Sequence, residues 1–454
     1  YPLFPILLIF CKPKGFRQLG RSGCLQSNIY GMKYTILKLL PILIIILSVF
    51  SVQQWLKFTI SNTTLIWIIV FAIILSIITF VNKINYKITN YISAFDLKVL
   101  NIYFIWLAIC TIRGMFIAEN YWEWKQLIEG CQALLLPITI YIFSIPFILK
   151  NILKLWMKYA LYIFLLIVPF LGKDAYHFYL GPIFLLGCFI SLFSRKWQII
   201  LGILLIIMLS IDLGARSQVI KSGIVIIIAL GIYLKKYIPI NFLKFLHWSC
   251  YIIPIVLLYL GISGKFNIFE DLASNQGKYV EKKVRNGQII EEDLSVDTRT
   301  FIYREVITSA VNHDYIICGR TPARGNDSQV FGSFSAEILK TGKYERHSNE
   351  LCHTNVFTWI GIIGLLLYSF IYLRSSYLAL YKSNNIYIKY LGCFIAFRWA
   401  FGWIEDFNKF DIMNLSLWML ISIGLSYQFR KMNNKEFTSI IKSILHHEKN
   451  SMAL

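Results

Sequence analysis

Long apolar stretches separated by short polar connectors recur along the chain from residue 35 to residue 428. A helix needs about 20 predominantly apolar residues to cross a bilayer, and most of these stretches approach that length. Most of them also lack the polar face that a surface helix of a soluble protein carries. The pattern predicts about twelve membrane-spanning helices, at residues 35–52, 64–81, 100–118, 133–149, 155–172, 176–194, 197–212, 218–234, 247–264, 355–373, 386–403 and 411–428.

A polar stretch interrupts this pattern between the ninth and tenth predicted spans. It covers residues 265–354, and its acidic and basic side chains nearly balance. We expect a helix within it, over the segment TRTFIYREVITSAVNH, with Phe301, Val306 and Ala310 on one side. A loop of this length in a compact bundle is usually functional, and a loop without a task is the alternative.

The first residues differ from the rest of the chain. Residues 1–31 hold an apolar run too short to span and then a basic patch, whereas Met32 precedes a typical spanning segment. We interpret residues 1–31 as an upstream extension and exclude them from the fold. The predicted organisation is the extension 1–31, spans one to nine over 32–264, the polar loop 265–354, spans ten to twelve over 355–430 and a basic tail over 431–454.

The basic residues gather in alternate connectors between the predicted spans. The chain has 45 Lys and Arg against 24 Asp and Glu, which gives a net charge of +21. Because cytoplasmic connectors carry such an excess, the alternation predicts an even number of spans, cytoplasmic termini and an outer polar loop. Cations beside anionic lipid account for the net charge, which leaves nucleic-acid binding as the weaker interpretation.

Several arginines depart from this rule. They lie near the outer ends of spans or in the outer loop, at one predicted depth, and they are Arg113, Arg216, Arg299, Arg304 and Arg398. Charges at membrane depth usually face the bundle interior and mark function. Guanidinium groups bind phosphate through forked bonds, so we expect a lipid-linked pyrophosphate here. The alternative is that each arginine reaches lipid headgroups or pairs with a nearby Asp or Glu.

A histidine begins the tenth predicted span at the same depth. His353, Ile360 and Gly364 share one face of a regular helix, and glycines at 361 and 364 would allow a neighbouring helix to approach closely. A histidine can accept a proton near neutral pH, which makes His353 a candidate general base. A structural, hydrogen-bonded histidine is the alternative, and His347 is a second candidate for the active residue.

Three sequence blocks resemble the O-antigen polymerase and O-antigen ligase superfamily (Wzy/WaaL-type membrane glycosyltransferases). LSIDLGARSQVI resembles its Arg-containing entry to a span and matches Arg216. DTRTFIYREVITSAVNHDYIICGR resembles its Arg-led helix and Gly-containing turn and matches Arg299, Tyr303 and Gly319. HTNVFTWIGIIGLLLY resembles its His/Asn and Gly-x-x-Gly segment and matches His353 and Asn355. The resemblance covers about residues 200 to 375, and a long outer loop before the tenth span fits it as well.

The resemblance implies an all-α, GT-C-like fold in the bacterial inner membrane. It implies an enzyme that transfers a glycan from undecaprenyl pyrophosphate at the periplasmic face without metal, nucleotide sugar or other cofactor. Arg216 and Arg299 would hold the pyrophosphate, and His353 would deprotonate the acceptor hydroxyl. The further substrate-binding candidates are Arg304, Arg320, Arg324, Asn355, Arg113 and Arg398. The expected partners are the lipid-linked oligosaccharide, membrane lipid and a chain-length regulator protein, and no nucleic acid.

Other functions remain open on the sequence. We favour a polymerase that joins lipid-linked repeat units for O-antigen or capsule, ahead of a ligase that moves glycan to the lipid A core. A flippase or other transporter would share the helices and the buried cations, and internal repeats would favour it. A non-enzymatic scaffold gives no reason for arginines at one depth. The nine cysteines show no zinc-binding spacing, and a disulfide between Cys318 and Cys352 would lie near the outer loop.

Overall fold

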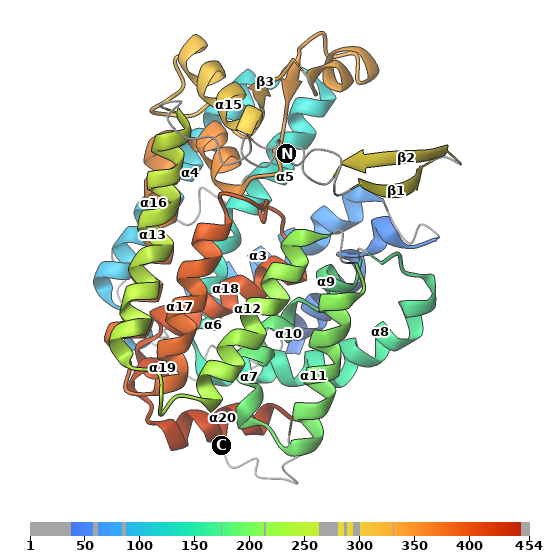
Figure 1. Cartoon of the computed structure of the whole chain (residues 1–454). Helices are drawn as coiled ribbons and strands as arrows, with labels where there is room; N and C mark the ends of the chain where they lie inside the picture. Colours follow the sequence, from blue (N-terminus) through green and yellow to red (C-terminus); the bar gives the residue numbers. More distant parts are fainter. Residues whose placement is uncertain are drawn as a thin grey trace, which may run out of the picture.

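The computed structural model describes residues 38–57, 62–83, 88–173, 175–212, 215–262, 280–285, 288–293, 300–329 and 331–445. These residues form a predominantly α-helical membrane protein, as predicted, with two short antiparallel pairs of strands. Figure 1 shows a bundle with α15 and β3 at one end and α20 at the other. We call these the cap end and the tail end. The expected extension 1–31 and the predicted site residue Arg299 lie outside the described residues.

The first half of the bundle consists of helices and short helical turns. Its N-terminal part holds a helical segment over 38–50, η1 (Gln53–Trp55), α3 (Thr63–Lys83), η2 (Ile88–Asn90), α4 (Ala94–Ile117), α5 (Tyr121–Leu134), η3 (Leu136–Thr139), α6 (Ile140–Phe143) and α7 (Pro146–Leu155). There follow η4 (Trp156–Ala160), α8 (Leu161–Ile167), η5 (Val168–Phe170), α9 (Ala175–Tyr179), α10 (Gly181–Cys188), η6 (Ile190–Leu192), α11 (Arg195–Ser210), α12 (Arg216–Tyr233) and α13 (Ile240–Ile262).

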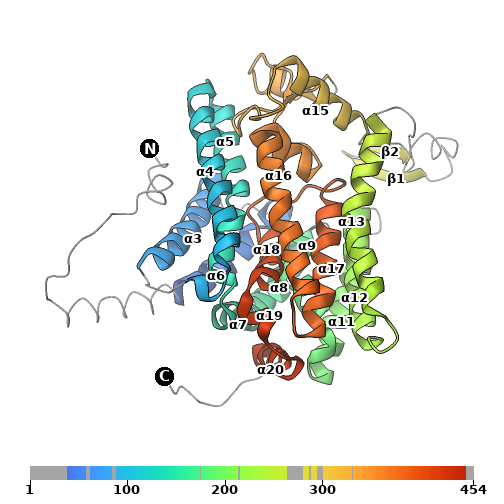
Figure 2. The same ribbon diagram turned by 90° about the vertical axis from the view of Figure 1, so that its left-hand side faces the viewer.

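The second half contains the cap and the last helices. The cap comprises α15 (Thr300–Asn312), η7 (Phe334–Ile338) and the antiparallel pair of β3 (Asn326–Asp327) with β4 (Glu345–Arg346). A β-hairpin pairs β1 (Val280–Arg285) with β2 (Gln288–Asp293). The remaining helices are α16 (Cys352–Tyr381), α17 (Ile386–Phe401), α18 (Ile412–Leu425), α19 (Tyr427–Lys431) and α20 (Asn434–Leu445). Figure 2 shows α15 lying across the cap end above α16.

Eight of the described helical segments are long and apolar enough to cross a membrane. They are Lys38–Trp55, Thr63–Asn82, Ala94–Ile117, Tyr121–Phe143, Pro146–Phe170, Arg216–Tyr233, Ile240–Leu260 and Cys352–Tyr381. The other four predicted spans are occupied by shorter helices. α11 and α17 have 16 residues each, α18 has 14, and α9 and α10 divide the sixth predicted span. By length and composition, eight helical segments of the described residues could cross a membrane, and the predicted count of twelve is not confirmed.

Polar side chains fix where several helices begin. Ser93 accepts a hydrogen bond from the backbone N–H of Asp96 at the start of α4, and Asn385 accepts one from Ile388 at the start of α17. Asp411 caps α18 in the same way through Asn414. Such caps satisfy backbone donors that a helix leaves unpaired at its N-terminus. The sequence therefore sets the ends of the helices even where apolar residues continue.

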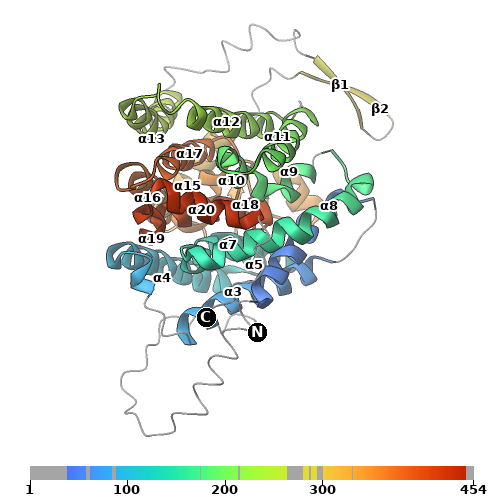
Figure 3. The same ribbon diagram turned by 90° about the horizontal axis from the view of Figure 1, so that it is seen from below.

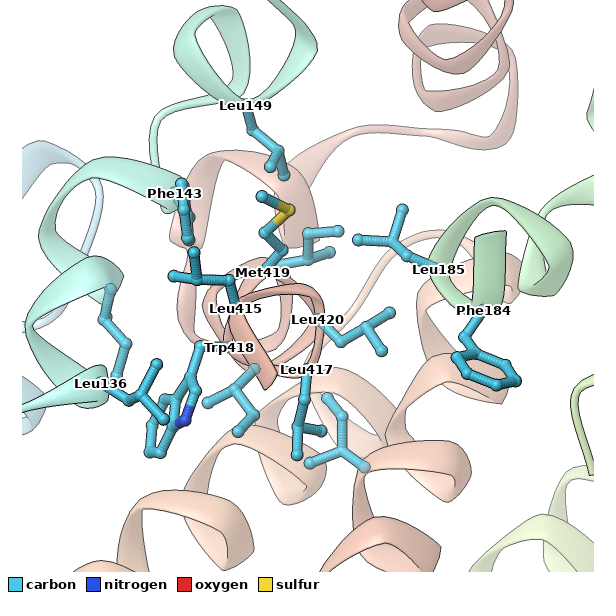
Figure 4. Close-up of a cluster of buried hydrophobic side chains, with 14 of the residues drawn as sticks. Leu136, Phe143, Leu149, Phe184, Leu185, Leu415, Leu417, Trp418, Met419 and Leu420 are labelled. Carbon is cyan, nitrogen blue, oxygen red and sulfur yellow. The ribbon is translucent and has the colours of Figure 1, made fainter. Parts of the chain in front are cut away.

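α18 forms the centre of the bundle. All 14 of its residues are buried, and they are apolar except for Asn414, Ser416 and Ser422, which donate hydrogen bonds to backbone carbonyls. Figure 4 shows Leu415, Trp418 and Met419 of α18 pointing toward Leu136, Phe143 and Leu149, while Leu420 faces Leu185. Viewed from the tail end, α18 lies between the α11–α12 side and the α3–α5 side (Figure 3). Its 14 residues are therefore a packing core for the helices around it.

The tenth predicted span, α16, is bent, which corrects the predicted helix face. Gly361 has a φ of 68° and a ψ of −173°, so the helix is interrupted there. Because the interruption changes the register, His353 and Gly364 do not share one continuous helical face. The close approach at Gly361 comes from the backbone of Ile317 and Gly319 in the cap, rather than from a neighbouring helix. A Cβ at Gly361 would meet the backbone of Ile317 and Gly319, and a Cβ at Gly319 would meet the backbone of residues 359–361. The crossing therefore requires both Gly319 and Gly361.

The predicted helix of the polar loop is confirmed as α15. Val306 and Ala310 are buried, as expected, and Phe301 is half-buried. Ile302 and Val306 pack on Leu351, the residue before α16. The cap is thus attached to the start of the helix that carries His353. Cys318 and Cys352 are both free cysteines, so the disulfide considered above does not form in this structure.

Candidate functional site at the cap end

Four of the predicted site residues lie at the cap end of different helices. Arg216 is the first residue of α12 and is exposed, and Arg304 is an exposed residue of α15. His353 is the second residue of α16, and Arg398 lies in the last turn of α17. The alternating chain directions of these helices bring their ends together, as the predicted topology requires. Arg299 belongs to the undescribed residues immediately before α15.

The turn after α17, residues 402–405, joins three of these helices. Glu405 Oε1 accepts hydrogen bonds from Lys221 Nζ at 2.7 Å and from Gln218 Nε2 at 3.4 Å, both on α12. The backbone N–H groups at the start of α16 donate to the same turn, Cys352 to the Glu405 carbonyl at 3.1 Å and His353 to the Gly402 carbonyl at 3.2 Å. The starts of α12 and α16 are therefore held against one segment.

α15 contacts the same turn through a tyrosine. The hydroxyl of Tyr303 donates to the carbonyl oxygen of Trp403. The two rings lie nearly parallel, with an interplanar angle of 28° and centroids 6.5 Å apart. Tyr303 follows Arg299 by four residues in the sequence. The 402–405 turn is therefore the common contact of α12, α15 and α16.

The imidazole of His353 is fully buried and has a defined tautomer. Its Nε2 lies 2.8 Å from the carbonyl oxygen of Trp399, an atom that can only accept, so Nε2 carries the proton. Nδ1 then holds a lone pair, and within the described part of the chain it has no hydrogen-bond partner. A neutral histidine with an unused lone pair is chemically suited to accept a proton.

Two cations and one carboxylate are sealed beneath this histidine. Lys221 is 1% exposed, Arg398 is 4% exposed, and Glu405 lies between them, 2.7 Å from Lys221 Nζ and 3.6 Å from Arg398 NH1. Burial alone would raise the pKa of Glu405, but the charges of Lys221 and Arg398 lower it below its ordinary value. Glu405 is therefore ionised at neutral pH and neutralises only part of the buried positive charge.

Lys221 was not among the site residues predicted from the sequence. It lies five residues after Arg216, about 7.5 Å further along α12 at the usual rise per residue. A lysine inside an otherwise apolar span was the available signal, because such charges usually mark function. With Phe394, Met413 and Arg398 it lines a cavity of about 20 Å³, which is enough for about one water molecule.

A half-buried aspartate follows Glu405. Burial raises the pKa of Asp406 to about 6, although hydrogen bonds from Asn408 and Asn355 work in the opposite direction. The backbone N–H of Asn408 donates to its Oδ1 at 3.0 Å. Asp406 is thus a second group that could exchange a proton near neutral pH. Its signal in the sequence was only its position beside Glu405.

The other predicted binding residues have partners within the protein. Arg113 donates to the carbonyls of Cys318 and Gly319 at 3.0 and 3.4 Å. Arg320 pairs with Asp327 at 2.7 Å, and Arg324 forms a two-pronged ion pair with Glu345. Asn355 exchanges hydrogen bonds with the backbone of Asn349 at 2.6 and 2.9 Å. These interactions stabilise the cap in this structure. That the same residues bind phosphate stays a prediction.

Charged residues also fasten the cap to the α4–α5 connection. Lys343 Nζ lies 2.7 Å from Glu119 and 2.6 Å from Glu123. Burial would raise the pKa of Glu345, but Arg324 and Arg320 lower it below its ordinary value. Burial lowers the pKa of His347, whose two ring nitrogens have no hydrogen-bond partner among the described residues. His347 belongs to the cap network, whereas His353 contacts the 402–405 turn.

Among the described residues no group of three or more His, Cys, Asp or Glu side chains could hold a metal ion. The fold defines a polytopic α-helical membrane protein that buries Lys221, Arg398, Glu405 and the imidazole of His353 at the cap end. No family model, curated protein or solved structure matches the chain. The function therefore has to be argued from the site itself.

Proposed function

We propose that the protein is a polysaccharide polymerase that joins undecaprenyl-pyrophosphate-linked repeat units at the periplasmic face of a bacterial inner membrane. The shorter α11, α17, α18 and the α9–α10 pair would cross with the eight longer spans, in a GT-C-like fold with twelve spans. Both termini would lie in the cytoplasm, and the cap would belong to a large periplasmic loop. A chain-length regulator protein is a further partner of such an enzyme.

The observation that carries this proposal is that the 402–405 turn contacts both a potential proton acceptor and two buried cations. His353 Nδ1 has no partner within the described chain, and the 402–405 turn ties its helix to α12, which begins with Arg216. Glycosyl transfer from a lipid pyrophosphate needs those two elements, a base for the acceptor hydroxyl and positive charge for the leaving group. Buried cations cost stability, so a purely structural role would favour apolar residues here.

The proposed reaction is a single displacement. The acceptor hydroxyl oxygen forms a bond to the anomeric carbon of the donor sugar, and its proton passes to His353 Nδ1. The bond between the anomeric carbon and the pyrophosphate oxygen breaks, and lipid pyrophosphate leaves with the electron pair. Arg216 and Arg299 hold this diphosphate at the surface, while Lys221 and Arg398 add positive potential from below. The chain's own residues thus supply the proton acceptor and the charge stabilisation.

Reconstitution of the purified protein tests the proposal. In proteoliposomes loaded with lipid-linked repeat units, we expect chains of two or more repeats on lipid pyrophosphate and release of free lipid pyrophosphate. Repeat units that cross the bilayer without any new glycosidic bond would contradict the proposal and favour the transporter. Transfer that occurs only after lipid A core is added would favour the ligase.

A further inference from the structure

Two tryptophans pack against the imidazole of His353, and a tyrosine packs on each of them. Trp399 and Trp403 contact it directly, with ring centroids at 5.2 and 4.6 Å. Tyr251 of α13 packs on Trp399 at 4.7 Å, and Tyr303 of α15 lies parallel to Trp403. We call Tyr251, Tyr303, Trp399 and Trp403 the aromatic box. It brings together α13, α15 and the end of α17 around the start of α16.

Three polar atoms inside this box lack partners. They are Nε1 of Trp399, Nε1 of Trp403 and Nδ1 of His353, all buried and without a hydrogen bond to the described chain. Trp399 as a whole is 4% exposed and His353 is 0% exposed. Buried donors and acceptors are normally paired, because an unpaired group loses its bonds to water without replacement. Two unpaired donors and one unpaired acceptor, on three rings that pack against one another, therefore point to a ligand that would pair with them.

The chemistry of the box restricts that ligand. The two indole N–H groups need acceptors, the imidazole nitrogen needs a donor, and the ring faces need an apolar surface. A sugar ring offers all three, since its hydroxyls both accept and donate and its C–H faces are apolar. A hydrocarbon tail would fill the box but leave the polar atoms unpaired. A phosphate would accept from the indoles but offer Nδ1 no proton when it is fully ionised.

We propose that the aromatic box is the subsite for the acceptor sugar, with Trp399 and Trp403 as its specificity-determining residues. This inference rests on the proposed function, because the hydroxyl bound at Nδ1 is the one that reacts. Tyr303 closes the box in this structure through its contact with Trp403, so α15 must shift before a sugar ring can enter.

Sugar binding by the purified full-length protein tests the inference without catalysis. The probe is the water-soluble oligosaccharide released by mild acid from the lipid-linked repeats of the strain that encodes the protein, and calorimetry measures its Kd. Trp403→Phe and Trp399→Phe keep an aromatic face but lose the N–H, so we expect binding to weaken about three- to tenfold. Trp403→Ala also loses the face and should weaken binding by more than about tenfold.

A matched control and a second readout separate this role from a structural one. Trp248 of α13 is 44% exposed and lies outside the box, so Trp248→Phe should bind the probe like the wild type. The Phe variants remove an unpaired buried donor, and their unfolding temperature should therefore stay the same or rise. A lowered unfolding temperature with unchanged Kd would assign Trp399 and Trp403 to packing and overturn the inference.

The remaining outcomes distinguish the inference from the proposed function. If the wild type polymerises repeats and the three box variants keep its KM for the acceptor, the box is not the acceptor subsite. The proposed polymerase function would still stand. If the wild type binds the oligosaccharide and the variants bind it weakly, but no repeat is ever joined, the aromatic box is a sugar-binding site. The proposed polymerase function is then contradicted. No binding of the oligosaccharide by the wild type at millimolar concentration would also overturn the inference.

Discussion

Each end of the bundle holds a buried carboxylate paired with a cation, yet the two pairs differ in their access to water. At the cap end Lys221 Nζ lies 2.7 Å from Glu405, and the two side chains are 1% and 11% exposed. At the tail end Arg374 Nε lies at the same 2.7 Å from Asp96, but the arginine side chain is 29% exposed. The distances match, whereas only the cap-end cation is sealed from solvent.

We interpret the tail-end pair as a structural anchor and the cap-end cluster as part of the candidate site. Asp96 also bonds to Ser93 Oγ at 2.5 Å, and Arg374 reaches the surface, so the tail-end pair ties α4 to α16 at modest cost. The cap-end cluster seals a second cation, Arg398, and leaves Glu405 Oε2 without a hydrogen bond in the described chain. Such an arrangement is costly and is retained where charge is needed for another purpose.

The largest expected effect comes from removing the cap-end carboxylate. Glu405→Ala leaves Lys221 and Arg398 buried without their counter-charge, which should lower the free energy of unfolding by about 3–5 kcal/mol. Asp96→Ala is the matched control and should cost about 1–2 kcal/mol, because Arg374 can turn toward water. Denaturant titration in mixed micelles measures both. Equal losses would show that the two pairs do not differ.

Removing the cap-end lysine alone should separate stability from activity. Lys221→Met leaves Glu405 paired with Arg398, so no charge is buried without a counter-charge and the free energy of unfolding should stay within about 2 kcal/mol of the wild type. Repeat-unit joining should nevertheless fall at least about tenfold, because the cluster loses its excess positive charge. A wild-type joining rate in a well-folded Lys221→Met variant would make the pair a structural anchor like Arg374 and Asp96.

The smallest expected effect is a loss of stability of the cap when the pH is lowered. Because the pKa of His347 is lowered in the fold, its contribution to stability is complete above the ordinary value of 6.5 and declines as the pH falls below it. The pKa of Glu345 is also lowered, so its contribution is complete above 4.5 and is lost as the pH falls through the folded value. Other charges facing His347 are Glu123, Arg324 and Lys343.

Protease cleavage within residues 320–347 measures this loosening. Cleavage should increase in two stages as the pH is lowered from 7 to 4, and His347→Gln should remove the first stage. Cleavage near α19 at the tail end should not change over the pH range of the first stage. It therefore serves as the internal control. A cap that is equally protected at pH 7 and pH 5 in the wild type would contradict the prediction.

Much of the bundle could be predicted from hydrophobic lengths and alternating charges. The starts of α4 and α17 and the helix α15 follow from local signals, namely caps and an amphipathic run. The length of α18 could not be predicted, because a helix buried on all sides looks like any other apolar segment. The interruption at Gly361 depends on a loop packed against it from elsewhere in the chain, which no local pattern encodes.

The residue types of the candidate site could be predicted from the sequence. The ion pairs and hydrogen bonds that these residues form could be predicted less well. Depth along the spans placed Arg216, His353 and Arg398 at one end, and the structure has them there. Which arginine meets which carboxylate depends on long-range packing, so the ion pairs of Arg320 and Arg324 with the cap were not foreseen. The tautomer of His353 depends on the Trp399 carbonyl, 46 residues further along the chain.

The most direct test compares the two candidate histidines in one joining assay. His353→Gln and His347→Gln are purified and supplied with lipid-linked repeat units at saturation, and the rate of glycosidic bond formation is measured. A base at His353 predicts a fall of at least about 100-fold for His353→Gln and a rate within about threefold of the wild type for His347→Gln. A wild-type rate in His353→Gln would contradict the assignment of the site to the 402–405 turn.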